Sequence, residues 1–236
     1  MTVQEAINAT YLKATGKSTS LTSGSHYTKI LALLDFYQRA WAREPGVDWN
    51  SLYDPAFSLG TVTATDAFDL DTSTIRKLSD REGDVVRIMW DDGTGYTDYT
   101  IVDHRVLKDY YAGQNKESSF GNYCARIGSQ LVFNNKFSTS DNEYGGEIQV
   151  PCYLYPDAIS SSTLSDDVQV NDPDWLVTRC AAEYVRTDIT RQGQYGNLLA
   201  EANEKMGRMK DDENAQINDV DRPWTPFSGL QDGAWE

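Results

Sequence analysis

The chain has 236 residues, of which 21 are Lys or Arg and 36 are Asp or Glu, so its formal net charge is −15. This acidic balance argues against tight binding to duplex DNA, because neutralising phosphates requires clustered cations. The three cysteines lie far apart without a CxxC pair, and no apolar run approaches the length of a membrane span. We therefore expect no disulfide framework, no zinc site and no membrane partner.

Two helices are predicted at the start of the chain. Apolar residues recur at helical spacing from Val3 to Ala14, with Thr2 suited to the N-cap and Gly16 to the C-terminal end. A second helix is predicted up to residues 45–46, a Pro-Gly pair that ends it. Its apolar stripe consists of Tyr27, Ile30, Leu34, Tyr37 and Trp41, broadened by Leu31, Leu33, Phe36 and Ala40.

Residues 59–159 change to a period near two, with turn residues between short runs, which is typical of β structure. Two hairpins are predicted, over residues 85–102 and 123–133, the second turning at Gly128-Ser129. Residues 104–111 are helix-like, and residues 147–155 form a further strand. Pro151 within that strand predicts an edge strand or a bulge, since proline cannot donate to a ladder.

Residues 171–216 predict two consecutive helices, or one long helix with a break at residues 193–196. Asp172 and Pro173 are typical of a helix start. Beyond the break the apolar stripe resumes and runs toward the acidic residues 211–213, where the helix dipole disfavours negative charge. We expect that end either to fray or to be held by something outside the chain. The resumed stripe consists of Tyr195, Leu198, Leu199, Ala202, Met206 and Met209.

The last twenty residues show no periodicity and yet carry four large apolar side chains. Ordering such a segment costs more conformational entropy than these side chains return on burial. We therefore predict an arm that a preformed groove on a partner or a neighbouring subunit captures. The residues predicted to bind that partner or neighbouring copy are Met206, Met209, Trp224, Phe227, Leu230 and Trp235.

These patterns predict an α+β protein. Its N-terminal helices (residues 1–58) and C-terminal helices (160–216) are expected to form a helical bundle. A β-rich insertion (59–159) would project from the bundle, and an extended C-terminal arm (217–236) would complete the chain.

No motif predicts catalysis, a cofactor or a metal. His26 and His104 have no second ligand at helical spacing, so each is interpreted as a surface or capping residue. Asp66, Asp69 and Asp71 lack the spacing and the closing Glu of a calcium loop, which favours a solvated turn over a weak Ca²⁺ site. With 36 acidic residues, paired carboxylates carry no information about hydrolysis. We expect a protein that is not an enzyme.

The chain resembles the head-to-tail adaptor, or connector, proteins of short-tailed bacteriophages, which form a ring beneath the portal. The resemblance rests on these stretches: YLKATGKSTS, YTKILALLDFYQRAWAREPGVDWNSLYDP, IRKLSDREGDVVRIMW, TIVDHRVLKDYY, NYCARIGSQLVFNNKF, GGEIQVPCYLYP and DWLVTRCAAEYVRTD. It implies a virion protein, assembled in the host cytoplasm into a dodecameric ring with a helical-bundle core. The implied partners are the portal protein, copies of the chain itself, and tail nozzle or tail-fibre proteins. Genome DNA would pass through the lumen without specific binding, which an acidic wall suits.

A second interpretation stays open on the sequence alone. Tyrosines are frequent between residues 96 and 155, and Tyr96 and Tyr99 are candidates for a sugar-binding face. The chain would then be a carbohydrate- or receptor-binding β module of a tail. Tyrosines at this density also occur in the core and rim of a sheet or in a subunit interface, because the ring is apolar and its tip is polar.

Overall fold

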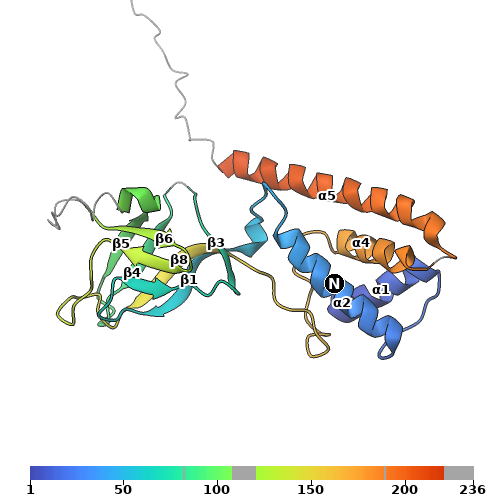
Figure 1. Ribbon diagram of the computed structural model, residues 1–236, viewed down its shortest axis with the longest axis horizontal. Coiled ribbons are helices and arrows are strands. Elements are labelled where there is room, and N and C mark those ends of the chain that lie inside the picture. Colours follow the sequence, from blue (N-terminus) through green and yellow to red (C-terminus); the bar gives the residue numbers. More distant parts are fainter. Residues whose placement is uncertain (82, 108–120, 189, 221–236) are drawn as a thin grey trace, which may run out of the picture. The chain divides into compact units, whose positions relative to one another are not determined.

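The computed structural model describes residues 1–81, 83–107, 121–188 and 190–220, with residues 216–220 described by their backbone alone. The chain divides into two compact units. The α unit consists of Met1–Val47 and the described residues from Asp157 onward, and the β unit consists of Asp48–Pro156. Figure 1 shows the long helices in the first unit and the strands in the second.

The first helix, α1 (Val3–Thr15), begins and ends as its sequence predicts. The hydroxyl of Thr2 accepts a hydrogen bond from the N–H of Glu5 at 3.2 Å, and the Glu5 carboxylate accepts one from the N–H of Thr2 at 2.8 Å. This reciprocal pair is a capping box, which satisfies two otherwise unpaired donors. At the other end Gly16 adopts a φ of 70° and donates to the carbonyl of Leu12 at 2.7 Å.

The second helix, α2 (Ser25–Ala42), buries Tyr27, Ile30, Leu34 and Trp41 on one face, as predicted. Gln38 takes the place in the stripe that was assigned to Tyr37, and only 2% of Gln38 is exposed. Its amide is satisfied on both sides: Nε2 donates to the Asp157 carbonyl at 3.0 Å, and Oε1 accepts from the N–H of Gln169 at 2.9 Å. A buried polar side chain is tolerated where its hydrogen bonds are made.

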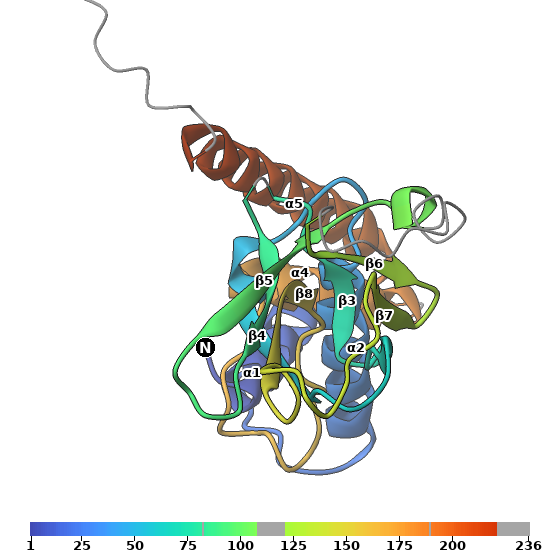
Figure 2. The same cartoon turned by 90° about the vertical axis from the view of Figure 1, so that its left-hand side faces the viewer.

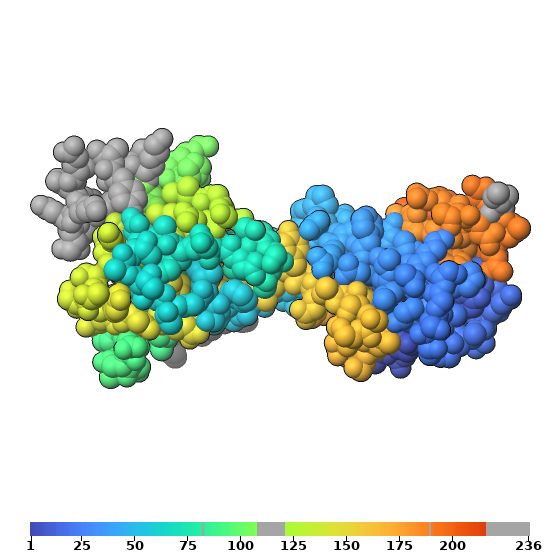
Figure 3. Space-filling view, turned by 60° about the horizontal axis from the view of Figure 1, so that its bottom comes forward, coloured from blue at the N-terminus to red at the C-terminus, as the bar shows by residue number. Residues whose placement is uncertain are grey.

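Residues 157–170 run alongside the N-terminal end of α1, and Figure 3 shows this segment in gold against the blue helices. The backbone N–H of Val3 donates to the carbonyl of Asp166 at 2.9 Å, and that of Val168 donates to the carbonyl of Met1 at 3.0 Å. A β-bridge joins Thr2 to Asp167. The segment therefore belongs to the α unit as an integral part and not as a free linker.

Two helices complete the α unit, and α4 (Pro173–Arg186) begins as predicted, with the Asp172 carboxylate accepting the N–H of Asp174 at 2.9 Å. The next helix, α5 (Gln192–Val220), corrects two predictions. Its break from α4 lies between Arg186 and Gln192, so residues 193–196 are helical; an interior glycine costs only about 1 kcal/mol, which packing can offset.

The predicted fraying of α5 at residues 211–213 is also wrong, because the helix continues through them. Glu213 is 2% exposed, and its carboxylate accepts a hydrogen bond from Asn171 Nδ2 at 3.2 Å. Contacts within the chain therefore hold this end of the helix. The predicted arm was to begin at residue 217, but residues 217–220 belong to α5. The remainder of the arm lies outside the described residues.

The β unit is built on an eight-stranded sheet with the order β1-β8-β4-β5-β6-β7-β2, in which β3 also pairs with β8. All of these pairs are antiparallel except β5 with β6. Figure 2 shows the sheet curling. After a 3-10 turn (Asn50–Leu52), the strands are β1 (Tyr53–Thr61), β2 (Ala67–Asp69), β3 (Ile75–Leu78), β4 (Val85–Met89), β5 (Tyr96–Ile101), β6 (Tyr123–Ile127), β7 (Gln130–Phe133) and β8 (Glu147–Leu154).

Both predicted hairpins are confirmed. Strands β4 and β5 pair antiparallel, and so do β6 and β7, with Gly128 at a φ of 63° in the second turn. The helix-like segment begins at His104, and its part from residue 108 lies outside the described residues.

Of the two alternatives predicted at Pro151, the edge strand is wrong, because β8 has β1 on one side and β3 and β4 on the other. The other alternative, a bulge, is confirmed. The Pro151 carbonyl accepts a hydrogen bond from the N–H of Ser79 at 2.9 Å, so the missing N–H faces the side of β3 and β4, between the last β4 pair at Gln149 and the first β3 pair at Cys152. Asp54 of β1 pairs with Cys152 and Phe57 pairs with Val150, so the register of β1 shifts opposite Pro151. A proline thus lies inside the sheet at an irregular position.

The predicted fold class is also wrong. The chain is a mixed α/β protein dominated by the curled sheet, and not a helical bundle carrying a β-rich insertion. The sheet has an apolar core of its own, so it does not depend on the helices for burial. That core consists of Val62, Leu70, Ile75, Leu78, Val86, Ile88, Tyr99, Cys124, Leu131, Phe133, Phe137, Ile148, Val150 and Cys152.

Candidate interaction surface

Helix α4 is the centre of the α unit, and α1, α2 and α5 all pack on it. It is buried on almost every side, which explains why its sequence carries small and apolar residues around its whole circumference. The helices that pack on α4 therefore present the outer surfaces of the unit. The buried residues of α4 are Trp175, Leu176, Val177, Thr178, Cys180, Ala181, Ala182, Glu183, Tyr184 and Val185.

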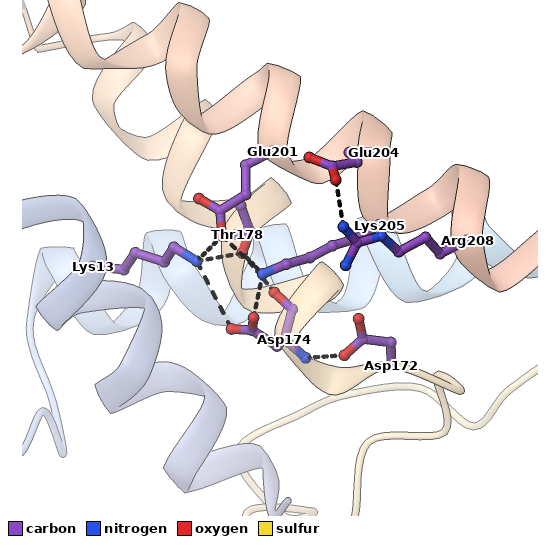
Figure 4. Close-up of polar contacts among 8 residues, drawn as sticks. All are labelled: Lys13, Asp172, Asp174, Thr178, Glu201, Glu204, Lys205 and Arg208. Atoms are coloured by element: carbon purple, nitrogen blue, oxygen red, sulfur yellow. Dashed lines mark hydrogen bonds and ion pairs between the residues drawn. The ribbon is translucent and has the colours of Figure 1, made fainter.

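A polar network joins α5 to α1 and α4 (Figure 4). Lys13 Nζ lies 2.7 Å from Glu201 Oε1 and donates to the Thr178 hydroxyl at 2.6 Å. Lys205 Nζ donates to Glu201 Oε1 at 2.8 Å and to Thr178 at 3.2 Å, and it also pairs with Asp174. Thr178 is fully buried, so it presents a fixed acceptor to both ammonium groups.

The protonation equilibria of this network favour the charged forms. Hydrogen bonds from Lys13 and then Lys205 lower the pKa of Glu201. Burial disfavours the Lys205 ammonium, but the hydrogen bonds to Asp174 and Glu201 outweigh burial and raise its pKa. The network thus fixes α5 to the rest of the α unit at neutral pH.

Of the six predicted binding residues, the structure describes the two methionines, both on α5. Met209 is 6% exposed and packs within its own chain, whereas Met206 is half-buried. They therefore do not form one exposed pair. The other four, Trp224, Phe227, Leu230 and Trp235, lie outside the described residues.

An exposed aromatic face on α2 was missed from the sequence. Phe36 is 62% exposed, and its ring meets that of Tyr37 edge-on with centroids 5.0 Å apart. The sequence analysis placed Phe36 in the broadened apolar stripe. The exposure of Phe36 could have been predicted from helical spacing. At about 100° per residue, Phe36 lies on roughly the opposite side of the helix from the buried residues Ile30 and Leu34.

Arginines of α4 border this aromatic face. The guanidinium of Arg179 lies over the Tyr37 ring, 4.8 Å from its centroid. Glu183 is 7% exposed and is held between Arg179 at 3.2 Å and Arg186 at 3.0 Å. Two guanidinium groups against one carboxylate leave a net positive charge in this cluster, which reaches α2 at Tyr37.

Three of the histidine and aspartate candidates, His26, Asp69 and Asp71, have side-chain partners within the chain. Nδ1 of His26 lies 2.6 Å from the Tyr184 hydroxyl, and both rings pack against Tyr11. The Asp71 carboxylate accepts hydrogen bonds from Ser73 and Thr74 within one turn, which lowers its pKa to about 2. Asp69 accepts from Gln130 at 2.9 Å. Within the described ranges, no three His, Cys, Asp or Glu side chains are grouped to hold a metal ion.

Tyr96 and Tyr99 do not share a face of the sheet. Tyr96 is 52% exposed and lies under the guanidinium of Arg87, which is 4.1 Å from its ring centroid. Tyr99 is 3% exposed and packs against Phe133, with ring centroids 4.8 Å apart. Burial also raises the pKa of the Tyr99 hydroxyl. These two tyrosines therefore do not make the predicted sugar-binding face.

The α unit has a shallow pocket of about 290 Å³, lined by Gln38, Asp157, Asp166 and Gln169 among others. The amide of Gln169 donates to the Asp157 carboxylate at 2.9 Å, so these two lining side chains already satisfy each other.

None of the helices in the described part of the chain has the length and apolar character needed to cross a membrane. Comparison of the sequence with protein-family models and with curated proteins gave no match.

Proposed function

We propose that the protein is a head-to-tail adaptor of a short-tailed bacteriophage particle, with a structural and not a catalytic role. The observation that carries this proposal is the anchoring of α5. The helix has 29 residues, which at about 1.5 Å each corresponds to a rod of roughly 43 Å. Glu201 fixes it to Lys13 of α1 and Lys205 fixes it to Asp174 of α4, and it leads directly into the aromatic residues of the last part of the sequence.

A rod anchored in this way suits the presentation of a binding segment to another molecule. The rigid part is held before contact is made, so less conformational entropy is lost on binding than with a wholly flexible tail. Trp224, Phe227 and Trp235 are of the aromatic side-chain types that are enriched in protein interfaces, and Leu230 adds a further apolar side chain. The proposed acceptor is the portal ring, with tail nozzle or tail-fibre proteins on the opposite side and DNA passing through the lumen.

The chain's net charge of −15 supports the conduit part of the proposal. A negative wall repels phosphates and lets DNA pass without being retained.

Truncation tests the proposal. A chain that ends at Val220 keeps α5 and lacks residues 221–236. We expect it to unfold at the same temperature as the full chain and to fail to co-sediment with purified portal rings.

A full-length Trp224→Ala/Trp235→Ala variant serves as the matched control. It keeps the length of the chain and should lose most of the binding, because large aromatic side chains dominate interface energetics. Undiminished co-sedimentation of the truncated chain would show that the last residues do not contact the portal.

A further inference from the structure

We propose that the exposed face of α2 is the contact surface for a second copy of the chain, which docks through the acidic residues Asp211 and Asp212 of its own α5. This inference rests on the proposed function, because a ring of copies requires two complementary surfaces on each subunit. The α2 face is defined here as Leu33, Phe36, Tyr37 and Ala40, with Arg179 and Arg186 of α4 at its border.

The aromatic part of the α2 face supplies the anchor. Phe36 is the most exposed large apolar side chain of the described residues, at 62%, and Leu33, Tyr37 and Ala40 are only partly buried around it. These positions lie three and four residues apart, so they form one continuous stripe along the helix. An aromatic residue rimmed by charged groups is typical of an interface centre.

Charge decides which partner fits this surface. Glu183 neutralises only one of the two guanidinium groups that it contacts, Arg179 and Arg186, and Arg186 is 58% exposed. The α2 face is therefore locally positive on a chain whose net charge is −15. A partner that places carboxylates beside the arginines gains favourable electrostatic complementarity.

The chain itself offers such carboxylates on a different helix. Asp211 and Asp212 are exposed near the end of α5, while the neighbouring Glu213 is buried and Lys210 pairs with Glu44. The acidic pair is thus held on an ordered helix and directed to solvent. Helices α2 and α5 pack separately on α4, so the two surfaces are distinct patches of one subunit.

Two distinct complementary patches make a heterologous contact, in which the α2 face of one copy meets the α5 of the next. Such a contact propagates and closes into a ring when the rotation between copies allows it. The inferred interface therefore accounts for ring assembly by two surfaces of the α unit alone.

Cross-linking between two single-cysteine-addition variants tests the inference. One copy carries Ala32→Cys, one helical turn from Phe36, and the other carries Ala215→Cys, one turn from Asp211 and Asp212; both positions are exposed, and the proposed contact residues stay intact. The two proteins are mixed at about 1 mM each with a short bismaleimide, so that a contact with a Kd near 1 mM is substantially populated. The native cysteines, Cys124, Cys152 and Cys180, are fully buried, so the introduced thiols are the reactive ones. We expect the mixed dimer to form at least fivefold more than in a control mixture with Leu12→Cys, an exposed position on α1 (46%).

Charge reversal gives the second measurement. Arg186→Glu in the Ala32→Cys copy should reduce the cross-linked product severalfold, and Asp211→Lys added to the Ala215→Cys copy should restore it. Yields equal to the Leu12→Cys control, or yields unaffected by charge reversal, would overturn the inference.

Portal binding separates this inference from the proposed function. An Ala32→Cys copy that still co-sediments with portal rings and yet does not cross-link disproves the α2 contact alone. Cross-linking without any co-sedimentation of the full chain contradicts the adaptor function and leaves the self-contact standing.

Discussion

Replacing Thr178 by Val removes one hydroxyl from the network that holds α5 and keeps the shape of the side chain. The Thr178 hydroxyl accepts hydrogen bonds from Lys13 at 2.6 Å and from Lys205 at 3.2 Å, and it donates to the carbonyl of Asp174 at 2.6 Å. Thr178 is fully buried, so water cannot replace the lost acceptor without opening the helix interface.

The expected loss of unfolding free energy depends on which partners the ammonium groups of Lys13 and Lys205 keep after the substitution. A hydrogen bond to a charged group contributes about 1.5 to 3 kcal/mol. Both lysines keep Glu201, at 2.7 and 2.8 Å, so neither is left as an unpaired charge. The longer bond from Lys205 contributes the smaller share. We expect the substitution to lower the free energy of unfolding of the α unit by about 2 to 4 kcal/mol.

Urea unfolding monitored by circular dichroism measures this loss, and hydrogen exchange locates it. The amides of α5 should lose more protection than those of α2. Thr178→Ser is the matched control, because it keeps the hydroxyl and removes one buried methyl group, which costs about 1 kcal/mol. A Val variant as stable as the Ser variant would refute the idea that this network fixes α5.

A double-mutant cycle sharpens the result. If the Lys13 hydrogen bond carries much of the effect, Thr178→Val should cost less in a Lys13→Met background, with a coupling energy of at least about 1 kcal/mol. Additive losses would assign the effect to Lys205 or to the carbonyl of Asp174.

Three further predictions concern other parts of the molecule. Because the folded-state pKa of Glu201 lies below 4.5, its contribution is present above that pH and is lost as the pH falls through the folded value; Glu201→Gln should therefore flatten the acid limb of a stability profile measured by urea unfolding. Gly146→Ala should destabilise the protein by about 3 kcal/mol or more in thermal melts, because the added Cβ would lie 1.7 Å from the Met89 carbonyl oxygen. The control is Gly207→Ala on α5, where the Cβ meets no atom within 4 Å, so this change should be neutral or stabilising by up to about 1 kcal/mol. Equal effects of the two substitutions would contradict this account. Ellman's reagent at about pH 8 should label no thiol before unfolding and every thiol after it, since burial raises the pKa of Cys124 and of Cys152 to about 12 and raises that of Cys180 as well.

Local signals in the sequence determined the helix starts and the hairpins. The capping box at Thr2, the N-cap at Asp172 and the turn at Gly128 each depend on residues within a few positions, so a short stretch of sequence contains all the necessary contacts. The apolar stripe of α2 likewise identified its buried face, apart from Gln38.

Only the tertiary structure decided which elements dominate and where they end. Gln38 is buried because residues 157 and 169 supply its partners, and Pro151 lies inside the sheet opposite a register shift of β1. The fixing of α5 depends on Lys13 and Glu201, which are 188 positions apart in the chain. Such contacts link segments whose proximity no local pattern encodes, because the residues that meet are far apart in the sequence.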